Sequence, residues 1–278
     1  MRPPVALTIA GSDPSGGAGI QADLKSFSAL GAYGTTVITA LTAQNTRGVT
    51  GVRPVPADFV REQFETLIAD VRIDAIKIGM LGTAELARCV AELLRSVPGV
   101  PVVLDPVMVA TSGDRLLDAD AVAAVRELLP LAEVITPNLP EAAVLLGTEP
   151  ASDRAGMAAQ ARALAALGTT ALVKGGHAPG GVGLSGQAVD VYADAAGVTE
   201  FTAPVVRTQN THGTGCSLSS AIAALRPQRP DWRTAIADAK AWLTGALAAA
   251  DRLEVGHGHG PVHHFHQLWP ADPSGSHA

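Results

Sequence analysis

The sequence predicts an α/β fold in which βαβ units surround a mainly parallel sheet. Short apolar runs rich in β-branched residues alternate with longer segments of helical periodicity along most of the chain. Polar residues or glycines follow the ends of the expected strands. Ligands bind outside the carboxyl ends of strands in open α/β sheets, so these positions are the first place to expect a site.

The elements follow in chain order. Buried strands are expected at residues 5–9, 37–41, 75–78, 102–104, 134–135 and 171–174. Between the early strands, apolar residues recur at helical spacing in three sets: Ile20, Leu24 and Phe27; Val60, Phe64 and Leu67; Leu86, Val90 and Leu93. Further helices are expected at 118–129, 140–146, 153–167, 217–224 and 235–253. A glycine-rich surface loop, 175–186, precedes an antiparallel pair at 188–193 and 198–203.

Length and composition favour one large domain. The chain has 278 residues, of which 47% are hydrophobic and 17% charged, so its core is expected to consist mostly of Ala, Val, Leu and Ile. We expect one domain over residues 1–270 and a frayed tail over 271–278. A net charge of -6 without a long basic run predicts no nucleic-acid or membrane partner.

Two cysteines in unlike contexts, and an N-terminus that leads directly into a strand, predict a reduced, cytoplasmic protein. No apolar run reaches the ~20 residues that a bilayer span needs. Cys89 lies on the face of Leu86, Val90 and Leu93 and is expected in the core.

The segment from Thr211 to Cys216, T-H-G-T-G-C, is a glycine-rich turn before a helix of small residues. Gly213 and Gly215 allow consecutive N–H groups of the turn, including that of Thr214, to converge on an anion at a helix N-terminus. The same field is expected to lower the pKa of the Cys216 thiol, which would then accept a proton during group transfer. A plain helix entry with a buried cysteine remains the alternative.

A polar glycine loop, residues 11–19, follows the first expected strand. It formally matches the dinucleotide fingerprint, but the second strand lacks the acidic residue such a site requires. We interpret it as a substrate-enclosing loop, with Asp23 one turn inside the next helix. Asp23 could equally be a solvated partner of the helix dipole. The chain has no Walker A motif, which argues against a P-loop enzyme.

Candidates for handling phosphate are dispersed at later strand ends: Asp105, Asn138 with Glu141, and Lys174. Oxygen donors from Asp105, Asn138 and Glu141 suit Mg2+, which keeps several of its waters. Asn138 and Glu141 could instead be a helix-capping pair. Five histidines between His257 and His266 suggest a metal site, but they alternate with glycines and lack cysteine partners, so packing roles are favoured.

Taken together, six motifs resemble the hydroxymethylpyrimidine/phosphomethylpyrimidine kinases of thiamine biosynthesis. They are AGSDPSGGAGIQAD at 10–23, AQNT at 43–46, KIGM at 77–80, TPNLPEA at 136–142, VKGGH at 173–177 and NTHGTGC at 210–216. The resemblance extends to EVGH at 254–257 and GPVHHFH at 260–266. It implies a ribokinase-like, three-layer α/β/α fold with a central, mostly parallel sheet, usually a homodimer, with ATP and Mg2+ as cofactors.

The resemblance also implies residue roles. Gln44 would bind the amino edge of the pyrimidine, with Asp23, Met80 and Gly11 framing the pocket. The turn of Gly213, Thr214, Gly215 and Cys216 would form the anion hole. Asn138, Glu141, Lys174 and Thr211 would serve the nucleotide phosphates, with Asp105 and Glu141 towards the metal. Lys240 matches a further family lysine near the active site.

The activity implied is stepwise phosphorylation of 4-amino-5-hydroxymethyl-2-methylpyrimidine, first to the monophosphate and then to the diphosphate. The alcohol of the first step needs a base, for which Cys216 is the candidate, whereas a phosphate monoester is already ionised. Two rivals remain: a pyridoxal-type vitamin kinase, and a catalytically silent pyrimidine-binding regulator on the same fold.

Overall fold

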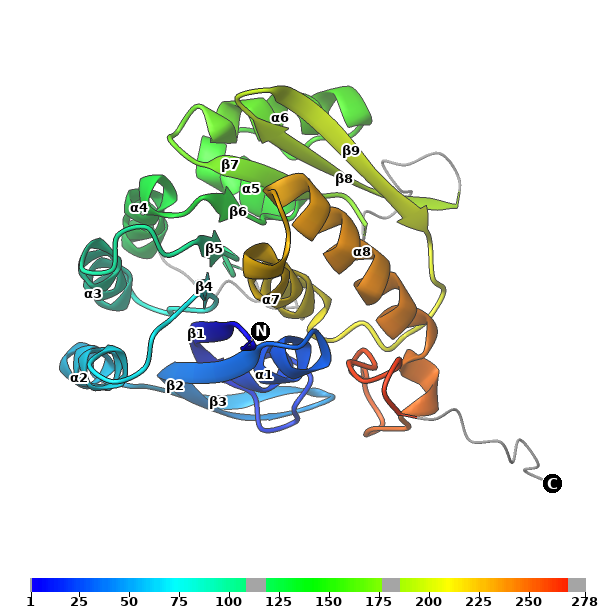
Figure 1. Cartoon of the computed structure of the whole chain (residues 1–278). Helices are drawn as coiled ribbons and strands as arrows, with labels where there is room; N and C mark the ends of the chain where they lie inside the picture. Colours follow the sequence, from blue (N-terminus) through cyan, green and yellow to red (C-terminus); the bar gives the residue numbers. More distant parts are fainter. Residues whose placement is uncertain (1, 109–118, 177–185, 270–278) are drawn as a thin grey trace.

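The computed structural model describes residues 2–108, 119–176 and 186–269, and in these ranges nine strands form one sheet (Figure 1). Their order is β3-β2-β1-β4-β5-β6-β7-β8-β9. The strands are β1 (Val5–Ser12), β2 (Tyr33–Asn45), β3 (Gly48–Pro54), β4 (Ala75–Ile78), β5 (Val102–Leu104), β6 (Val134–Ile135), β7 (Thr170–Lys174), β8 (Gln187–Asp194) and β9 (Gly197–Pro204).

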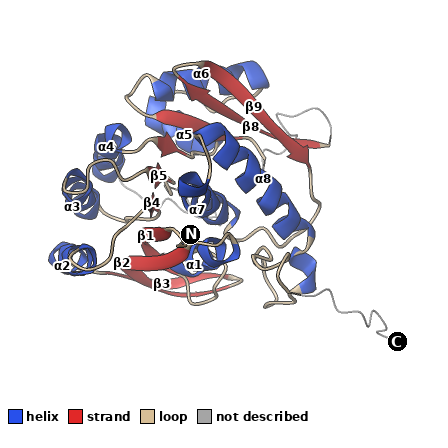
Figure 2. Cartoon of the chain, in the orientation of Figure 1, coloured by secondary structure: helices blue, strands red, loops and turns tan. Residues whose placement is uncertain are grey.

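Strands β2, β1 and β4 to β7 are parallel. At one edge β3 pairs antiparallel with β2, and at the other β8 pairs antiparallel with both β7 and β9. Helices cover both faces of this sheet (Figure 2). They are α1 (Gly19–Ala29), α2 (Ala57–Ile68), α3 (Ala84–Arg95), α4 (Ala119–Leu128), α5 (Leu139–Leu146), α6 (Arg154–Ala165), α7 (Thr214–Leu225) and α8 (Trp232–Ala248). The predicted three-layer fold with a mostly parallel sheet is confirmed.

Each face of the sheet has its own apolar core. One core joins the sheet to α2 through α6, and the other joins it to α1, α7 and α8. Cys89 is buried in the first core, as expected. All residues from Ser217 to Leu225 are buried, and most of them are Ser or Ala, whose small side chains let α7 pack closely on the middle of the sheet. This packing brings the N-terminus of α7 to the carboxyl edge of the parallel strands.

The elements differ from the sequence expectation in a few places. Strand β3 was not predicted, because most of its side chains are exposed and it lacks an apolar alternation. Helix α7 begins at Thr214, so the glycine turn runs directly into its first turn. The last long helix ends at Ala248 and continues only as a short 3-10 turn, Ala250–Arg252. Residue 118, most of the expected 175–186 loop and the 271–278 tail lie outside the described residues.

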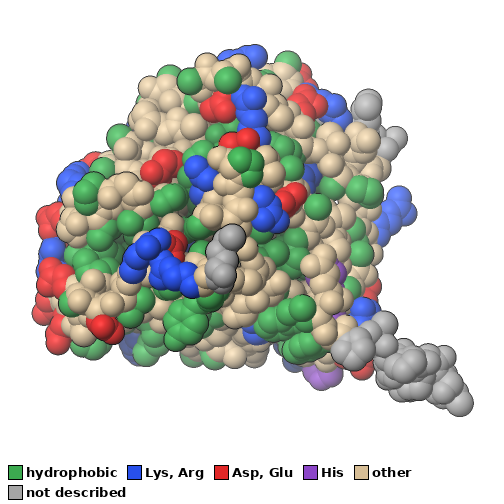
Figure 3. Space-filling view, in the orientation of Figure 1, with side chains coloured by type: hydrophobic (Ala, Val, Ile, Leu, Met, Phe, Trp, Pro, Cys, Tyr) green, Lys and Arg blue, Asp and Glu red, His purple; other side chains and the backbone are tan. Residues whose placement is uncertain are grey.

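On the face seen in Figure 3, acidic and basic side chains are interspersed. Among the described residues, none of the helices combines the length and the apolar character that a bilayer span requires.

Candidate active site

The glycine loop after β1 and the turn before α7 pack directly against each other. Gly213 caps α7 with a φ of 76°, and a Cβ there would lie 1.7 Å from the carbonyl oxygen of Gly17. A Cβ at Gly17 would lie 2.3 Å from Cδ2 of His212. Both contacts require glycine, so the loop and the turn form one continuous backbone surface at the helix N-terminus.

Asp13 organises the glycine loop. Its carboxylate accepts from the backbone N–H of Ser15 and Ala18, each at 2.8 Å, and from the Ser15 hydroxyl at 2.7 Å. Nε2 of His212 lies 2.8 Å from the same carboxylate. Burial opposes ionisation, but His212 and the loop donors together lower the pKa of Asp13 to about 2. The loop is therefore folded around one ionised carboxylate.

Sequence reasoning missed both Asp13 and His212, which are 199 residues apart in the chain. An Asp-Pro-Ser run is a recognisable turn signal, since Asp side chains accept from backbone N–H groups two residues on. Nothing in the local sequence, however, connects that turn to His212.

Three of the predicted substrate residues lie around this loop. Gln44, near the end of β2, is 3.3 Å from His212 Nε2. A Cβ at Gly11 would lie 2.7 Å from Cε of Met80, whose backbone carbonyl accepts from Thr39. An amide near the end of β2 and a thioether just after β4 are thus brought near one glycine loop, a combination that suits a flat heterocycle with a polar edge.

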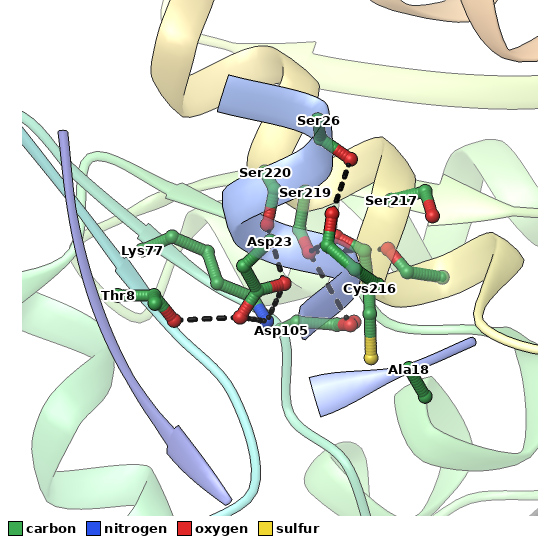
Figure 4. Close-up of polar contacts among 12 residues, drawn as sticks. Thr8, Ala18, Asp23, Ser26, Lys77, Asp105, Cys216, Ser217, Ser219 and Ser220 are labelled. Carbon is green, nitrogen blue, oxygen red and sulfur yellow. Dashed lines mark hydrogen bonds and ion pairs between the residues drawn. The ribbon is translucent and has the colours of Figure 1, made fainter. Parts of the chain in front are cut away.

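Asp23 lies elsewhere. Its side chain is completely buried and forms an ion pair with Lys77, with Nζ and Oδ1 2.8 Å apart (Figure 4). The hydroxyls of Thr8 and Ser220 each donate to it at 2.6 Å. With no exposed surface, Asp23 does not face solvent, so its interpretation as a solvated partner of the helix dipole is wrong. The expectation that Asp23 helps to frame the pyrimidine pocket stays a prediction.

Lys174 and Asp105 meet beneath the first turn of α7. Lys174 Nζ lies 2.9 Å from Oδ1 of Asp105, and a Cβ at Gly215 would be 3.2 Å from that same Nζ. Burial opposes both charges, yet the pair holds the pKa of Asp105 below and that of Lys174 above their ordinary values. A fixed cation at a helix N-terminus is a ready site for a phosphoryl anion.

Asn138 and Glu141 form a capping box at the start of α5, each side chain accepting the other's backbone N–H at 2.9 Å. Burial raises the pKa of Glu141 to about 7; Lys174 opposes this and Asp105 adds to it. The capping interpretation is confirmed, and Glu141 also lies within electrostatic reach of the Lys174–Asp105 pair.

The carboxyl groups of Asp105 and Glu141 fit Mg2+, although the described residues contain no cluster of three or more His, Cys, Asp or Glu side chains. Mg2+ commonly takes one or two carboxylates and completes its shell with waters and substrate phosphates. Asp105 and Glu141 supply two buried carboxyl groups of that kind.

Cys216 lies in the first turn of α7, but its thiol is not activated as expected. Burial raises the pKa of Cys216 to about 11; Lys77 opposes the rise, while Asp105 and Asp23 add to it. The predicted lowering of this pKa is wrong, because desolvation outweighs the field of the helix N-terminus. The thiol is protonated at neutral pH.

Lys240 is buried on α8, with Nζ 2.6 Å from Oδ2 of Asp190. The other oxygen of Asp190 accepts from the backbone N–H of Gly175 at 3.1 Å. Lys240 thus neutralises the carboxylate that holds the chain just after Lys174. Lys240 therefore lies near Lys174, and its expected role at the nucleotide phosphates stays a prediction. Thr211 closes the glycine turn, since its carbonyl accepts from the hydroxyl of Thr214 at 2.6 Å.

The histidines near the C-terminus make packing contacts. His264 is buried with Nε2 2.9 Å from the Ser217 hydroxyl, one residue after Cys216. The ring of His266 lies 6.2 Å from that of Trp242. These contacts attach the C-terminal segment to the start of α7 and to α8.

Comparisons with known proteins show the family to which this chain belongs. The family model described as phosphomethylpyrimidine kinase matches residues 13–263. The hydroxymethylpyrimidine/phosphomethylpyrimidine kinase of Escherichia coli (strain K12) is 56% identical over 266 residues, covering 95% of this chain and 98% of that protein.

Two solved structures are similar along most of the chain. Phosphomethylpyrimidine kinase from Clostridium difficile 630 aligns with a TM-score of 0.76 at 38% identity, covering 88% of this chain and 99% of that one. Pyridoxal kinase from Staphylococcus aureus, in complex with AMP-PCP and pyridoxal, aligns with a TM-score of 0.84 at 32% identity, covering 96% and 95%. With its ribokinase-like sheet and its glycine turn above Lys174, this chain belongs to the phosphomethylpyrimidine kinase family.

Proposed function

We propose that this protein uses ATP to phosphorylate 4-amino-5-hydroxymethyl-2-methylpyrimidine to its monophosphate and then to the diphosphate, as in thiamine biosynthesis. The observation that carries the proposal is the placement of Lys174 and Asp105 beneath Gly215 at the N-terminus of α7. This site can stabilise a transferring phosphoryl group in a chain that is 56% identical to the Escherichia coli enzyme of that name.

In the first reaction the hydroxymethyl oxygen attacks the γ-phosphorus of ATP, the bond from that phosphorus to the bridging oxygen breaks, and ADP leaves. Backbone N–H groups of the Gly213–Gly215 turn and the ammonium of Lys174 hold charge on the phosphoryl oxygens. Mg2+, held by Asp105 and Glu141, would neutralise further phosphate charge. Because phosphoryl transfer is loose, the proton of the alcohol leaves late. The thiolate form of Cys216 takes that proton, although it is the minor form at neutral pH.

The second reaction has a different acceptor. The second pKa of a phosphate monoester is about 6, so the monophosphate arrives largely ionised. No base is needed, and the anion cradle, formed by the Gly213–Gly215 turn and Lys174, positions the two phosphates. One site therefore serves two acceptors, and only one of them depends on Cys216.

ATP consumption by the purified full chain tests the proposal, with hydroxymethylpyrimidine, its monophosphate, pyridoxine and ribose as separate acceptors. We expect turnover with the two pyrimidines. The likeness to pyridoxal kinase at a TM-score of 0.84 makes pyridoxine the second candidate substrate. Turnover with pyridoxine alone would support that rival. No turnover with any acceptor would support the silent regulator, which the intact Lys174–Asp105 pair disfavours.

We also propose a cytoplasmic homodimer. Strands β2 and β3 carry four exposed large apolar side chains, those of Tyr33, Leu41, Val49 and Val52, with exposed fractions of 64%, 54%, 47% and 40%. Large apolar side chains left exposed at the edge of a sheet favour contact with a second protein surface. Light scattering on the protein as it elutes from a size-exclusion column should give twice the mass of one chain. Cell fractionation should recover the kinase activity in the cytoplasmic fraction.

A further inference from the structure

The amide of Gln44 lies between two polar groups. Its nitrogen position is 3.3 Å from His212 Nε2, and its oxygen position is 3.2 Å from the Thr42 hydroxyl. A half-turn about the terminal bond exchanges nitrogen and oxygen without moving any other atom. Whether His212 Nε2 and the Thr42 hydroxyl donate or accept a hydrogen decides in which orientation both hydrogen bonds of the amide can form.

On one side, His212 Nε2 lies 2.8 Å from Oδ2 of Asp13. The ionised carboxylate of Asp13 can only accept, so Nε2 carries a hydrogen whether the imidazole is neutral or charged. An amide nitrogen facing that N–H would set donor against donor. The alternative, a bare Nε2, would place a lone pair against the carboxylate. The carbonyl oxygen of Gln44 therefore belongs towards His212.

On the other side, the Thr42 hydroxyl lies 2.8 Å from the carbonyl oxygen of Ser12. A hydroxyl has one hydrogen, and the shorter contact to a carbonyl takes it. The oxygen of Thr42 is then left as an acceptor, which suits the amide nitrogen of Gln44. Both neighbours thus select the same orientation.

We propose that Asp13, His212 and Thr42 fix the Gln44 amide in this orientation and thereby make the site select a 4-aminopyrimidine over its 4-oxo analogue. The inference rests on the proposed function. The 4-amino edge offers a donor beside a ring-nitrogen acceptor, whereas the 4-oxo edge offers an acceptor beside a ring N–H. A freely turning amide could pair with either edge. A fixed amide pairs only with the 4-amino edge. The 4-oxo edge could pair only if the ring turned over, which would carry the 5-hydroxymethyl group away from the phosphoryl site.

These three are positioning residues, and Thr42 gives the cleanest test because Thr42→Ser keeps the hydroxyl that Thr42→Val removes. Isothermal titration calorimetry without ATP would measure the binding of hydroxymethylpyrimidine and of its 4-oxo analogue to the full chain. We expect wild type to prefer the amino compound by roughly 100-fold. Thr42→Ser should stay within about twofold of that ratio, and Thr42→Val should lower it roughly tenfold.

Equal ratios in wild type, Thr42→Ser and Thr42→Val would overturn the inference. A readout without ligand separates this failure from failure of the proposed function. In labelled wild-type protein, the side-chain amide protons of Gln44 should show NOEs to Thr42 and not to the ring protons of His212. The reverse pattern overturns the inference whatever the protein binds. Binding of neither pyrimidine, with the expected NOEs, overturns the proposed function and its selectivity but leaves the amide orientation standing.

Discussion

Lys77 and Asp23 form an ion pair inside the protein, with Nζ and Oδ1 2.8 Å apart and neither side chain exposed (Figure 4). The Ser220 hydroxyl donates to the same oxygen of Asp23 at 2.6 Å. Ser220 lies one helical turn after Cys216, so both side chains are on one face of α7. The pair therefore fixes the helix that carries the glycine turn, and it places a buried cation close to the thiol.

The stability losses from removing the two members of this pair should not be additive. Asp23→Asn leaves the buried charge of Lys77 unpaired, and Lys77→Met leaves that of Asp23 unpaired. Each variant should lower the free energy of unfolding by about 3–5 kcal/mol. The double variant should lose clearly less than the sum of the two. Urea denaturation measures all three.

The exposed pair Arg154–Glu200, 3.0 Å apart with partly exposed side chains, provides the control. Arg154→Met should cost less than about 1 kcal/mol. Additive losses in the Asp23/Lys77 double variant would show that the two charges do not depend on each other.

Gln44→Ala should raise KM for hydroxymethylpyrimidine roughly 10- to 100-fold, because it deletes the hydrogen bonds to the polar edge of the ring. KM for ATP should stay nearly unchanged, since the side-chain contacts of Gln44 are to His212 and Thr42, whereas Lys174 pairs with Asp105. Steady-state kinetics with each substrate varied in turn separate the two effects. Gln187→Ala, an exposed glutamine in β8, is the matched control. An equal loss in apparent ATP affinity would mean that Gln44 serves the nucleotide site and not the pyrimidine pocket.

The sequence predicted the parts of the fold that depend on local periodicity. Buried strands such as β4 and β5, and the glycine turn before α7, follow from apolar runs and from backbone requirements at two positions. Strand β3 was missed because an exposed edge strand needs no apolar alternation.

The polar interior of the site could not be predicted in the same way. Asp13 meets His212 across 199 residues, and Asp23 meets Lys77 across 54, so each partner is specified only by the finished fold. The pKa of Cys216 was mispredicted for a related reason. A helix N-terminus can be read from sequence, whereas the depth at which α7 buries its first turn cannot.

His264 should make stability depend on pH below neutrality. Burial lowers the pKa of His264 to about 3, whereas an unfolded histidine titrates near 6.5. Between these values the unfolded chain binds a proton that the folded chain rejects, so stability falls as the pH falls from 6.5 towards 3. The loss from this group should reach about 2 kcal/mol at pH 5.

Replacing His264 by Gln, which can still pair with Ser217, should remove this contribution and flatten the dependence of unfolding free energy on pH between 7 and 5. His257→Gln changes an exposed histidine of the same segment and should leave the wild-type slope intact. A slope in His264→Gln equal to that of wild type would assign the acid sensitivity to other groups.

Cys216→Ala should damage phosphorylation of the alcohol much more than phosphorylation of the monophosphate, because only the alcohol must lose a proton. With its pKa raised to about 11, Cys216 is ionised in about one molecule in 10⁴ at pH 7. Its thiolate fraction, and with it kcat/KM for the alcohol, should rise close to tenfold per pH unit between 7 and 9. For the monophosphate, which is already ionised in that range, kcat/KM should stay nearly flat.

The pH profiles of the two acceptors separate a proton-accepting role of Cys216 from a purely steric one. Cys89→Ala changes the other cysteine, which is buried away from the site, and should leave both profiles as in wild type. In Cys216→Ala the rise with the alcohol should disappear, while the monophosphate profile keeps its shape. Equal losses for both acceptors, with the rise retained, would mean that Cys216 acts by shaping the anion cradle and that another group takes the proton.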